Sequence, residues 1–140
     1  MTIDELRLQD YDDAYRLWQG AAGIGLSSAD SREAIGRYLA RNPGMSSAAR
    51  DGSRLVGAVL AGHDGRRGFL HHLAVAAEER GRGTGRALVE RSLERLKAEG
   101  IAKAHIFLMN ENRSGRGFWE AVGWQPRSDI GVCSRDLEPR

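Results

Sequence analysis

The 140-residue sequence predicts one mixed α/β domain, residues 1–140, in which a single sheet is flanked by helices. Two observations lead to this fold class. Short apolar runs typical of strands alternate with stretches of helical periodicity, in the order β α α β β β α β α β. Hydrophobic residues make up 41% of the chain and charged residues 29%, which is the balance of a globular domain with its own core.

The N-terminal part is expected to form one strand and two helices. Residues 3–8 alternate apolar and polar side chains, which favours a strand. Asp10 is a suitable N-cap for the first helix, and Asp30 or Ser31 for the second. The second helix must end before Pro43, because the residue that precedes a proline disfavours helical backbone.

A hairpin and a third strand are expected in the middle of the chain. Residues 46–50 and 55–60 are joined by Asp51-Gly52, a strong hairpin signal. A second turn at Asp64-Gly65 precedes the apolar run 69–75, which reads as the next strand.

The C-terminal part begins with the clearest helix, residues 84–99, which ends at Gly100. An apolar strand is expected over 104–109. A short helix capped by Ser114 follows it and ends at Gly123. Residues 129–137 are expected to form a final strand, and one more short strand is possible near Trp124.

Residues 80–86, Arg-Gly-Arg-Gly-Thr-Gly-Arg, lie between a predicted strand and a predicted helix. Glycines let successive backbone N–H groups turn toward one point, and a helix N-terminus adds partial positive charge. The spacing is neither that of a Walker A loop, because no lysine follows the glycines, nor G-x-G-x-x-G, because Arg86 or Leu88 takes the place of the third glycine. The loop therefore indicates a polyphosphate ligand, and the alternative is a solvated arginine-rich turn.

Composition limits the cellular setting and the partners. No apolar run approaches the roughly 20 residues that span a bilayer, and the N-terminus lacks a signal peptide, so we expect a cytoplasmic protein without a membrane partner. The single cysteine, Cys133, excludes an internal disulfide and an all-cysteine metal site, and we expect no metal. Residues 80–103 carry seven Arg or Lys and three Glu, an excess that suits phosphates. With only 6% aromatic residues and no known nucleic-acid motif, a nucleic-acid partner is not expected.

Two separate motifs carry a family resemblance. R-x-x-G-x-G is present as Arg80, Gly83 and Gly85. The pattern N-x-x-A-x-x-x-Y-x-x-x-G-F is matched in spacing by Asn112, Gly115, Trp119, Gly123 and Trp124. Over residues 69–124 the chain resembles the GNAT superfamily of N-acetyltransferases.

The resemblance implies a fold and an activity. The fold is a central mixed, mostly antiparallel sheet of six or seven strands with about four helices. The activity is acetyl-coenzyme A-dependent transfer of an acetyl group to a primary amine of a small molecule or a protein, directly in a ternary complex. Two alternatives remain open: a non-catalytic acyl-coenzyme A-binding regulatory module of the same fold, and a basic nucleic-acid binder.

The resemblance also implies which residues hold the co-substrate. The diphosphate is expected on the loop and helix start, at Arg80, Gly81, Arg82, Gly83, Thr84, Gly85 and Arg86. The pantetheine arm is expected between two splayed strands, on the backbone of Leu73, Ala74 and Val75. Asn112 is expected to contact the arm, or else to serve as a turn or capping residue, and Trp119 to wall the arm or pack in the core.

Amine acetylation requires a base, because a free alkyl amine with a pKa near ~10.4 is protonated at neutral pH. His71 is the candidate, at a strand position where serotonin-type acetyltransferases carry histidine; the alternative is a structural histidine. Strand alternation predicts that His71 shares a face with Phe69, Leu73 and Val75 and that His72 points the other way. The weaker candidates are carboxylates expected in exposed loops: Glu78, Glu79 and Glu111.

The sequence indicates the general acid and the acceptor less clearly than the co-substrate site. Trp119 stands where many family members carry a tyrosine near the sulfur, and an indole N–H is not an acid near neutral pH. Either the thiolate leaves without an acid, or Tyr38 or Tyr15 serves, or turnover is poor. Asp30 and Glu33 could attract a cationic amine or act as helix caps. The pattern specifies neither the acceptor, nor monomer versus homodimer, nor whether the acyl group is strictly acetyl.

Overall fold

The computed structural model describes residues 1–138 and contains one five-stranded sheet in the order β1-β2-β3-β4-β5. The strands are β1 (Thr2–Glu5), β2 (Ser47–Asp51), β3 (Arg54–His63), β4 (Gly68–Val75) and β5 (Ala104–Ile106). The helices are α1 (Tyr11–Gln19), α2 (Arg32–Arg41), α3 (Thr84–Ala98) and α4 (Arg113–Ala121), with 3-10 turns at Leu8–Asp10, Ser28–Asp30 and Ala77–Glu79. Neighbouring strands are antiparallel except β4 and β5, which are parallel. The predicted mixed, mostly antiparallel α/β class is confirmed.

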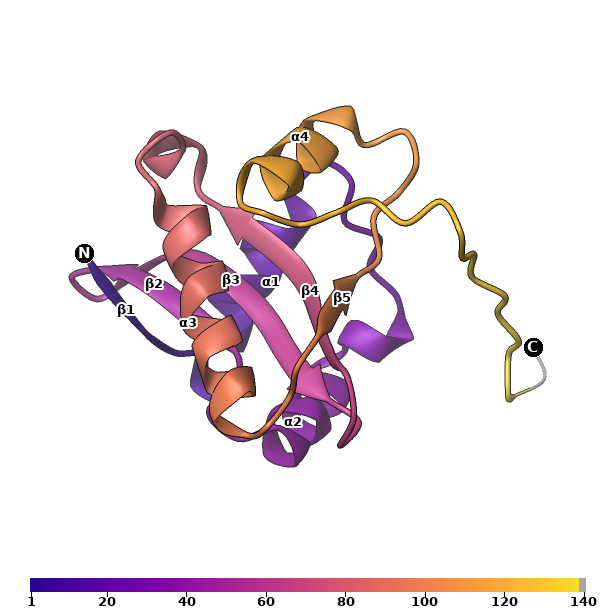
Figure 1. The fold of residues 1–140 in the computed structure, drawn as a ribbon. Coiled ribbons are helices and arrows are strands. Elements are labelled where there is room, and N and C mark those ends of the chain that lie inside the picture. Colours follow the sequence, from indigo (N-terminus) through magenta and orange to yellow (C-terminus); the bar gives the residue numbers. More distant parts are fainter. Residues whose placement is uncertain (139–140) are drawn as a thin grey trace.

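Helices cover both faces of the sheet, with α3 on one face and α1 and α2 on the other (Figure 1). Each face has its own apolar cluster, one including Val59 and Leu88, the other including Trp18 and Ala58. This double cover explains why residues 55–62 of β3 are all buried, since a strand between two helical layers has no solvent face.

Two predicted helix caps are in place, but one works differently from the expectation. Ser31 caps α2 by accepting a hydrogen bond from the N–H of Ala34 at 3.1 Å. Asp10 occupies the N-cap position of α1 without capping it. Its carboxylate instead accepts two hydrogen bonds from Arg50 of β2, at 2.8 and 2.9 Å. The helix start is therefore tied to the sheet by a buried ion pair.

The predicted final strand over 129–137 is wrong. Residues 124–138 form no helix or strand, and the segment runs away from the sheet in Figure 1. Ile130 and Val132 are 58% and 70% exposed, so an ordered strand would bury too little apolar surface here to offset its loss of conformational entropy. For the same reason the described sheet has five strands where six or seven were expected.

Two further boundaries differ from the sequence expectation. The strand expected over 104–109 ends at Ile106, and Phe107 beyond it is 64% exposed. The last helix begins one residue before Ser114, because Asn112 is its N-cap. Among residues 1–138, no helix combines the length and the apolar character needed to cross a membrane.

Candidate functional site

Strands β4 and β5 separate part way along the sheet. They pair at three positions only, Gly68 with Ala104, Phe69 with His105 and Leu70 with Ile106. Beyond Leu70, β4 continues to Val75 while β5 has ended. Within the part of the chain that the structure describes, the β5 side of residues 71–75 therefore has no strand partner. This open edge is the split that the family resemblance predicted.

A β-bulge lies where the split begins. Leu60 of β3 pairs with His71 and Ala58 pairs with Ala74, so β4 has one residue more than β3 between these pairs. The extra residue is His72, whose φ of 58° is in the left-handed region. A non-glycine residue adopts this conformation at a cost of about 1–2 kcal/mol. The surrounding structure must therefore compensate for it.

The bulge separates residues that the sequence placed on one face of the strand. Leu70 belongs to the apolar cluster under α3, and Leu73 and Val75 pack against the same cluster. The ring of His71 lies on the opposite side of the sheet, where it contacts Tyr38 of α2. The prediction that His71 shares a face with Leu73 and Val75 is therefore wrong, because strand alternation restarts after an inserted residue.

The open edge of β4 offers backbone groups at alternate residues. The N–H of Ala76 donates to Val56 of β3 at 2.8 Å, and Ala74 pairs with Ala58. Because backbone groups alternate along a strand, those of Leu73 and Val75 face away from β3 and into the split. Of the three residues predicted for the pantetheine arm, these two offer backbone hydrogen bonds to it.

The glycine-rich loop leads directly into α3. Gly81 and Gly83 have φ values of 77° and 81°, which a side chain would disfavour. Gly83 is the N-cap of α3, and no side chain caps the helix. The first turn of a helix has no internal acceptors for its N–H groups, so the amides of residues 84–86 can bind an anion.

The arginines of the loop differ in their contacts. Arg80 donates from Nε to the carbonyl oxygen of Val75 at 3.3 Å, which places its guanidinium beside the open edge of β4. Arg82 lies 3.6 Å from the carboxylate of Glu79. Arg86 is exposed and forms no ion pair with another described residue. Unlike Arg82, Arg80 and Arg86 are not near a described carboxylate partner, so their charges are available to a phosphate ligand.

Two residues of this segment have structural roles instead. Thr84 is buried, and its hydroxyl donates to the sulfur of Met1 at 3.5 Å. A Cβ on Gly85 would come within 3.2 Å of the Phe118 ring of α4. Gly85 therefore permits close packing of α4 against α3, in addition to carrying a first-turn N–H group.

His71 lies among aromatic side chains. Its ring is parallel to that of Phe69 at 6.4 Å and lies 5.9 Å from that of Phe107, measured between ring centres. Burial lowers the pKa of His71 below its ordinary value; the proximity of the His72 imidazole lowers it further, and Asp30 opposes the change. His71 is therefore neutral at neutral pH, as a proton acceptor must be.

The neighbouring His72 forms a contact that sequence reasoning missed. Its Nε2 lies 2.8 Å from Oδ1 of Asp30, and only 18% and 7% of the two side chains are exposed. Trp18 packs against the imidazole, with ring centres 5.3 Å apart. The His71-His72 doublet was visible in the sequence, but the pairing depends on the bulge and could not be seen there. Asp30, once considered an amine-binding residue, is occupied by this contact.

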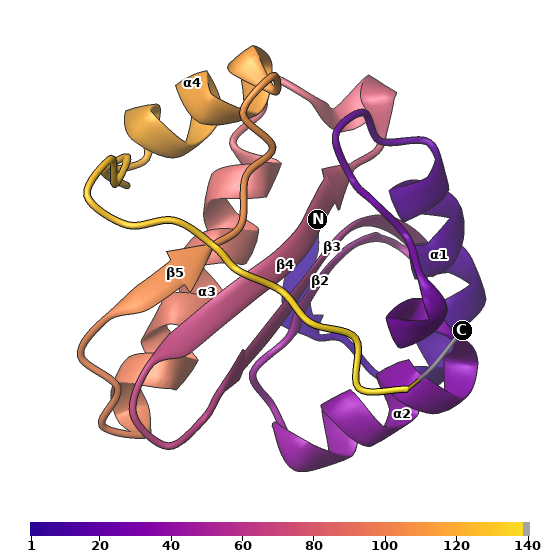
Figure 2. The ribbon, with the colours of Figure 1, turned by 90° about the vertical axis from the view of Figure 1, so that its right-hand side faces the viewer.

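Asn112 is the N-cap of α4, and Trp119 lies within this helix. Figure 2 shows α4 beyond the end of the sheet to which the β4 arrow points. The Asn112 side chain accepts a hydrogen bond from the N–H of Gly115 at 2.9 Å, so its oxygen is used as a helix cap. Its amide nitrogen lies against Gly23, where an added Cβ would come within 2.5 Å. The Trp119 ring packs edge-on against Trp124, with ring centres 5.0 Å apart, so it has the packing role that the sequence left as an alternative.

Other acid and base candidates are less well placed. The Tyr38 hydroxyl is buried without a hydrogen-bond partner, and burial raises its pKa far above the usual value. Glu79 is 6% exposed, so the expectation of an exposed loop charge is wrong for this residue. Glu78 is exposed and paired with Arg54, and Glu111 is exposed. None of these carboxylates contacts the histidines of β4.

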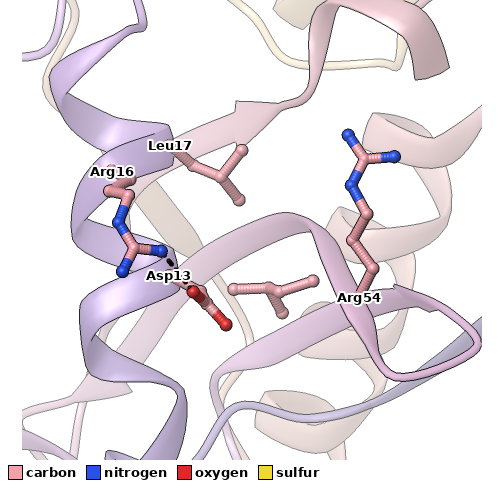
Figure 3. Close-up of a pocket in the computed structure, with 5 residues that line it drawn as sticks. Asp13, Arg16, Leu17 and Arg54 are labelled. Carbon is pink, nitrogen blue, oxygen red and sulfur yellow. Dashed lines mark hydrogen bonds and ion pairs between the residues drawn. The ribbon is translucent and has the colours of Figure 1, made fainter.

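A hollow of about 320 Å³ between α1 and the start of β3 is separate from these residues. Figure 3 shows Arg16 paired with Asp13 on one side of it and Arg54 on the other. Leu17 and Leu55 complete its lining. Its charges are already paired, and it includes no residue predicted for the co-substrate, so we assign it no part in the site.

Sequence comparison defines the class of protein. Residues 10–124 match the acetyltransferase (GNAT) family, so the chain belongs to this family. Acetyltransferase ECA0875 of Pectobacterium atrosepticum is 29% identical over 140 residues, which cover 100% of this chain and 99% of the relative. The family prediction is thereby confirmed, together with acetyltransferase activity and acetyl-coenzyme A as co-substrate.

Solved structures share the fold. The PaiA N-acetyltransferase of Thermoplasma acidophilum, in complex with coenzyme A, has a TM-score of 0.78 and 18% identity, with 94% of each chain covered. The ribosomal-protein-alanine N-acetyltransferase of Brucella melitensis has a TM-score of 0.72 and 21% identity, with 96% of this chain and 98% of that chain covered.

Proposed function

We propose that this acetyltransferase moves the acetyl group of acetyl-coenzyme A directly to a primary amine within a ternary complex. The observation that carries the proposal is the junction of the open β4 edge with the uncapped start of α3. An extended ligand arm and its anionic group would then be bound by adjacent parts of one surface.

Different residues of the chain bind the diphosphate and the pantetheine arm of the co-substrate. The amides of residues 84–86 hold the diphosphate, supported by the charges of Arg80 and Arg86. The backbone groups of Leu73 and Val75 pair with the pantetheine arm. One of these N–H groups stabilises the negative charge that develops on the thioester oxygen. Asn112 has only its amide nitrogen left to contact the arm.

The chemistry requires a neutral amine. His71 accepts the proton that the ammonium loses, because its aromatic surroundings keep the imidazole uncharged. The amine nitrogen then forms a bond to the carbonyl carbon, and the carbon–sulfur bond breaks with its electron pair passing to sulfur. The acceptor is a small-molecule amine or a protein amine; the similar fold of an enzyme that acetylates an alanine of a ribosomal protein supports the second class.

Two measurements test the proposal. Acetyl-coenzyme A at 100 times its Kd should stabilise the folded chain by about 2.7 kcal/mol, and amines should trigger release of free thiol. An unchanged melting temperature at saturating ligand would exclude the binding surface. Binding without thiol release across a broad amine panel would favour the non-catalytic acyl-coenzyme A-binding module instead.

A further inference from the structure

Acetylation of an ammonium ion removes two protons from one nitrogen. The first must leave before the nitrogen attacks the carbonyl carbon. The new nitrogen–carbon bond leaves the nitrogen positively charged again, so a second proton must leave before the amide is complete. The departing thiolate needs one proton to become a thiol below its pKa of about 8.5. Within the proposed function, His71 accounts for the first of these protons only.

The chain lacks the usual phenol for the remaining proton transfer. Trp119 packs against Phe118 and Trp124 at the position where a tyrosine would donate to sulfur. Tyr38 is buried, and its hydroxyl has no hydrogen-bond partner. Other polar side chains near the split between β4 and β5 are then candidates for the second proton.

His72 is held in one orientation at this split. Oδ1 of Asp30 lies 2.8 Å from Nε2 of the imidazole, while Oδ2 accepts the N–H of Ser27 at 3.0 Å. The carboxylate is thus fixed from two sides, and Trp18 packs on the imidazole ring. Because an ionised carboxylate only accepts hydrogen bonds, this contact uses Nε2 as the donor, so Nδ1 is the imidazole nitrogen that can accept a proton when the ring is neutral.

The backbone at His72 indicates that its position matters. This residue alone among the described non-glycine residues has a positive φ, and it is the inserted residue at the point where β4 loses its partner. Its ring centre lies 6.4 Å from that of His71. Strained non-glycine backbone of this kind is concentrated at functional sites.

We propose that His72, oriented by Asp30, takes the second proton from the acceptor nitrogen on Nδ1 and returns it to the departing sulfur. The carbonyl double bond re-forms as the carbon–sulfur bond breaks, and the sulfur keeps that electron pair until it receives the proton. Asp30 stabilises the imidazolium while the proton resides there, as the carboxylate does in other carboxylate–imidazole pairs. His72 thereby replaces the phenol that Trp119 cannot supply.

Four groups surround this proton path and can influence its pH dependence. Asp30 approaches from the 3-10 turn before α2, and His71 is the neighbour on β4. Tyr38 of α2 lies against His71, and Tyr11 of α1 donates from its hydroxyl to the backbone carbonyl of Asp30 at 2.6 Å.

The test compares the pH dependence of kcat in His72→Gln, Asp30→Asn and His71→Gln. Higher pH removes the first proton from the amine in solution but not the second, which is lost only after attack. His71→Gln should therefore lose about 100-fold at pH 7 and recover about tenfold per pH unit. His72→Gln should lose about as much without recovering, and Asp30→Asn should lose about tenfold.

His63→Gln is the matched control. His63 lies 3.7 Å from Glu99 at the far end of β3, so this variant also removes an imidazole beside a carboxylate, and its kcat should not change. Thermal stabilisation by acetyl-coenzyme A should persist in all variants, showing that each remains folded with an intact binding surface.

Three results would overturn the assignment. An unchanged kcat in His72→Gln would leave the pair a structural contact. Recovery of His72→Gln at high pH, like that of His71→Gln, would make His72 another acceptor of the first proton. Absence of acetyl transfer by the wild-type protein with every amine tested would overturn the proposed function and this inference together.

Discussion

Gly83 allows ligand binding to be separated from stability. Its φ of 81° is left-handed, and a Cβ added there would meet no atom within 4 Å. Gly83→Ala therefore introduces backbone strain without a clash, which costs about 1 kcal/mol. A chain of 140 residues has an unfolding entropy of about 0.3 kcal/mol/K, so the melting temperature should fall by about 3–4 °C.

Gly100 provides the control at the other end of α3. Its φ is 85° and its surroundings are equally open, so Gly100→Ala should lower the melting temperature by the same amount. Acetyl-coenzyme A at 100 times its Kd should raise the melting temperature of wild type and Gly100→Ala by about 9 °C. In Gly83→Ala the backbone strain falls on the residue directly before the amides proposed to bind the diphosphate, and a tenfold loss of affinity would halve that rise. Differential scanning fluorimetry measures all three proteins; equal ligand-induced shifts in the two variants would refute the placement of the diphosphate.

Three further outcomes are expected. His71→Gln should lower kcat/KM about 100-fold, and because the pKa of His71 is lowered by burial, the acid limb of the wild-type pH profile should lie below pH ~6.5; a limb above that value would contradict the assignment. Arg50→Met should lower the free energy of unfolding by about 3 kcal/mol in urea at pH 7, because it leaves the buried Asp10 carboxylate unpaired. Burial tends to raise the pKa of Asp10, but the hydrogen bonds from Arg50 leave it below the unfolded value of ~3.9. The difference in free energy of unfolding between wild type and Arg50→Met should therefore shrink as the pH falls below about 4. A difference that stays constant with pH would argue against the ion pair. Gly57→Ala would place a Cβ 2.9 Å from the Leu88 side chain and should lower the free energy of unfolding by about 1–3 kcal/mol, measured by thermal unfolding. An unchanged stability would show that the packing between β3 and α3 adjusts to the added methyl group.

Much of the fold, including the glycine-rich loop before α3, could be read from local chemistry. The helix over residues 84–98 begins after a left-handed glycine and ends before another, and its apolar side chains repeat at helical spacing. The hairpin turn at Asp51-Gly52 likewise depends on a few adjacent residues. Such features are determined within one or two turns of chain, so a sequence pattern is enough to reveal them.

The roles of two buried aspartates were harder to interpret, because their partners lie far away in the sequence. Asp10 was expected to cap a helix and instead binds Arg50, 40 residues away. Asp30 was expected to be a cap or an amine ligand; its carboxylate closes the capping box of the 3-10 turn at Ser28–Asp30 and also binds His72, 42 residues away. The sequence identified both carboxylates as residues of interest. Which residue each one binds depends on how the helices pack against the sheet.

The sequence by itself determined the family, the order of most elements and the loop that suits a diphosphate. Only the tertiary structure decided which way the two histidines of β4 face, because a single inserted residue, at a point set by pairing with β3, reverses the alternation of the strand. It also decided that residues 129–137 form no strand, since the gain from a strand depends on apolar surface that neighbouring elements must cover. Local propensity acts over a few residues, whereas register and burial are properties of the assembled sheet.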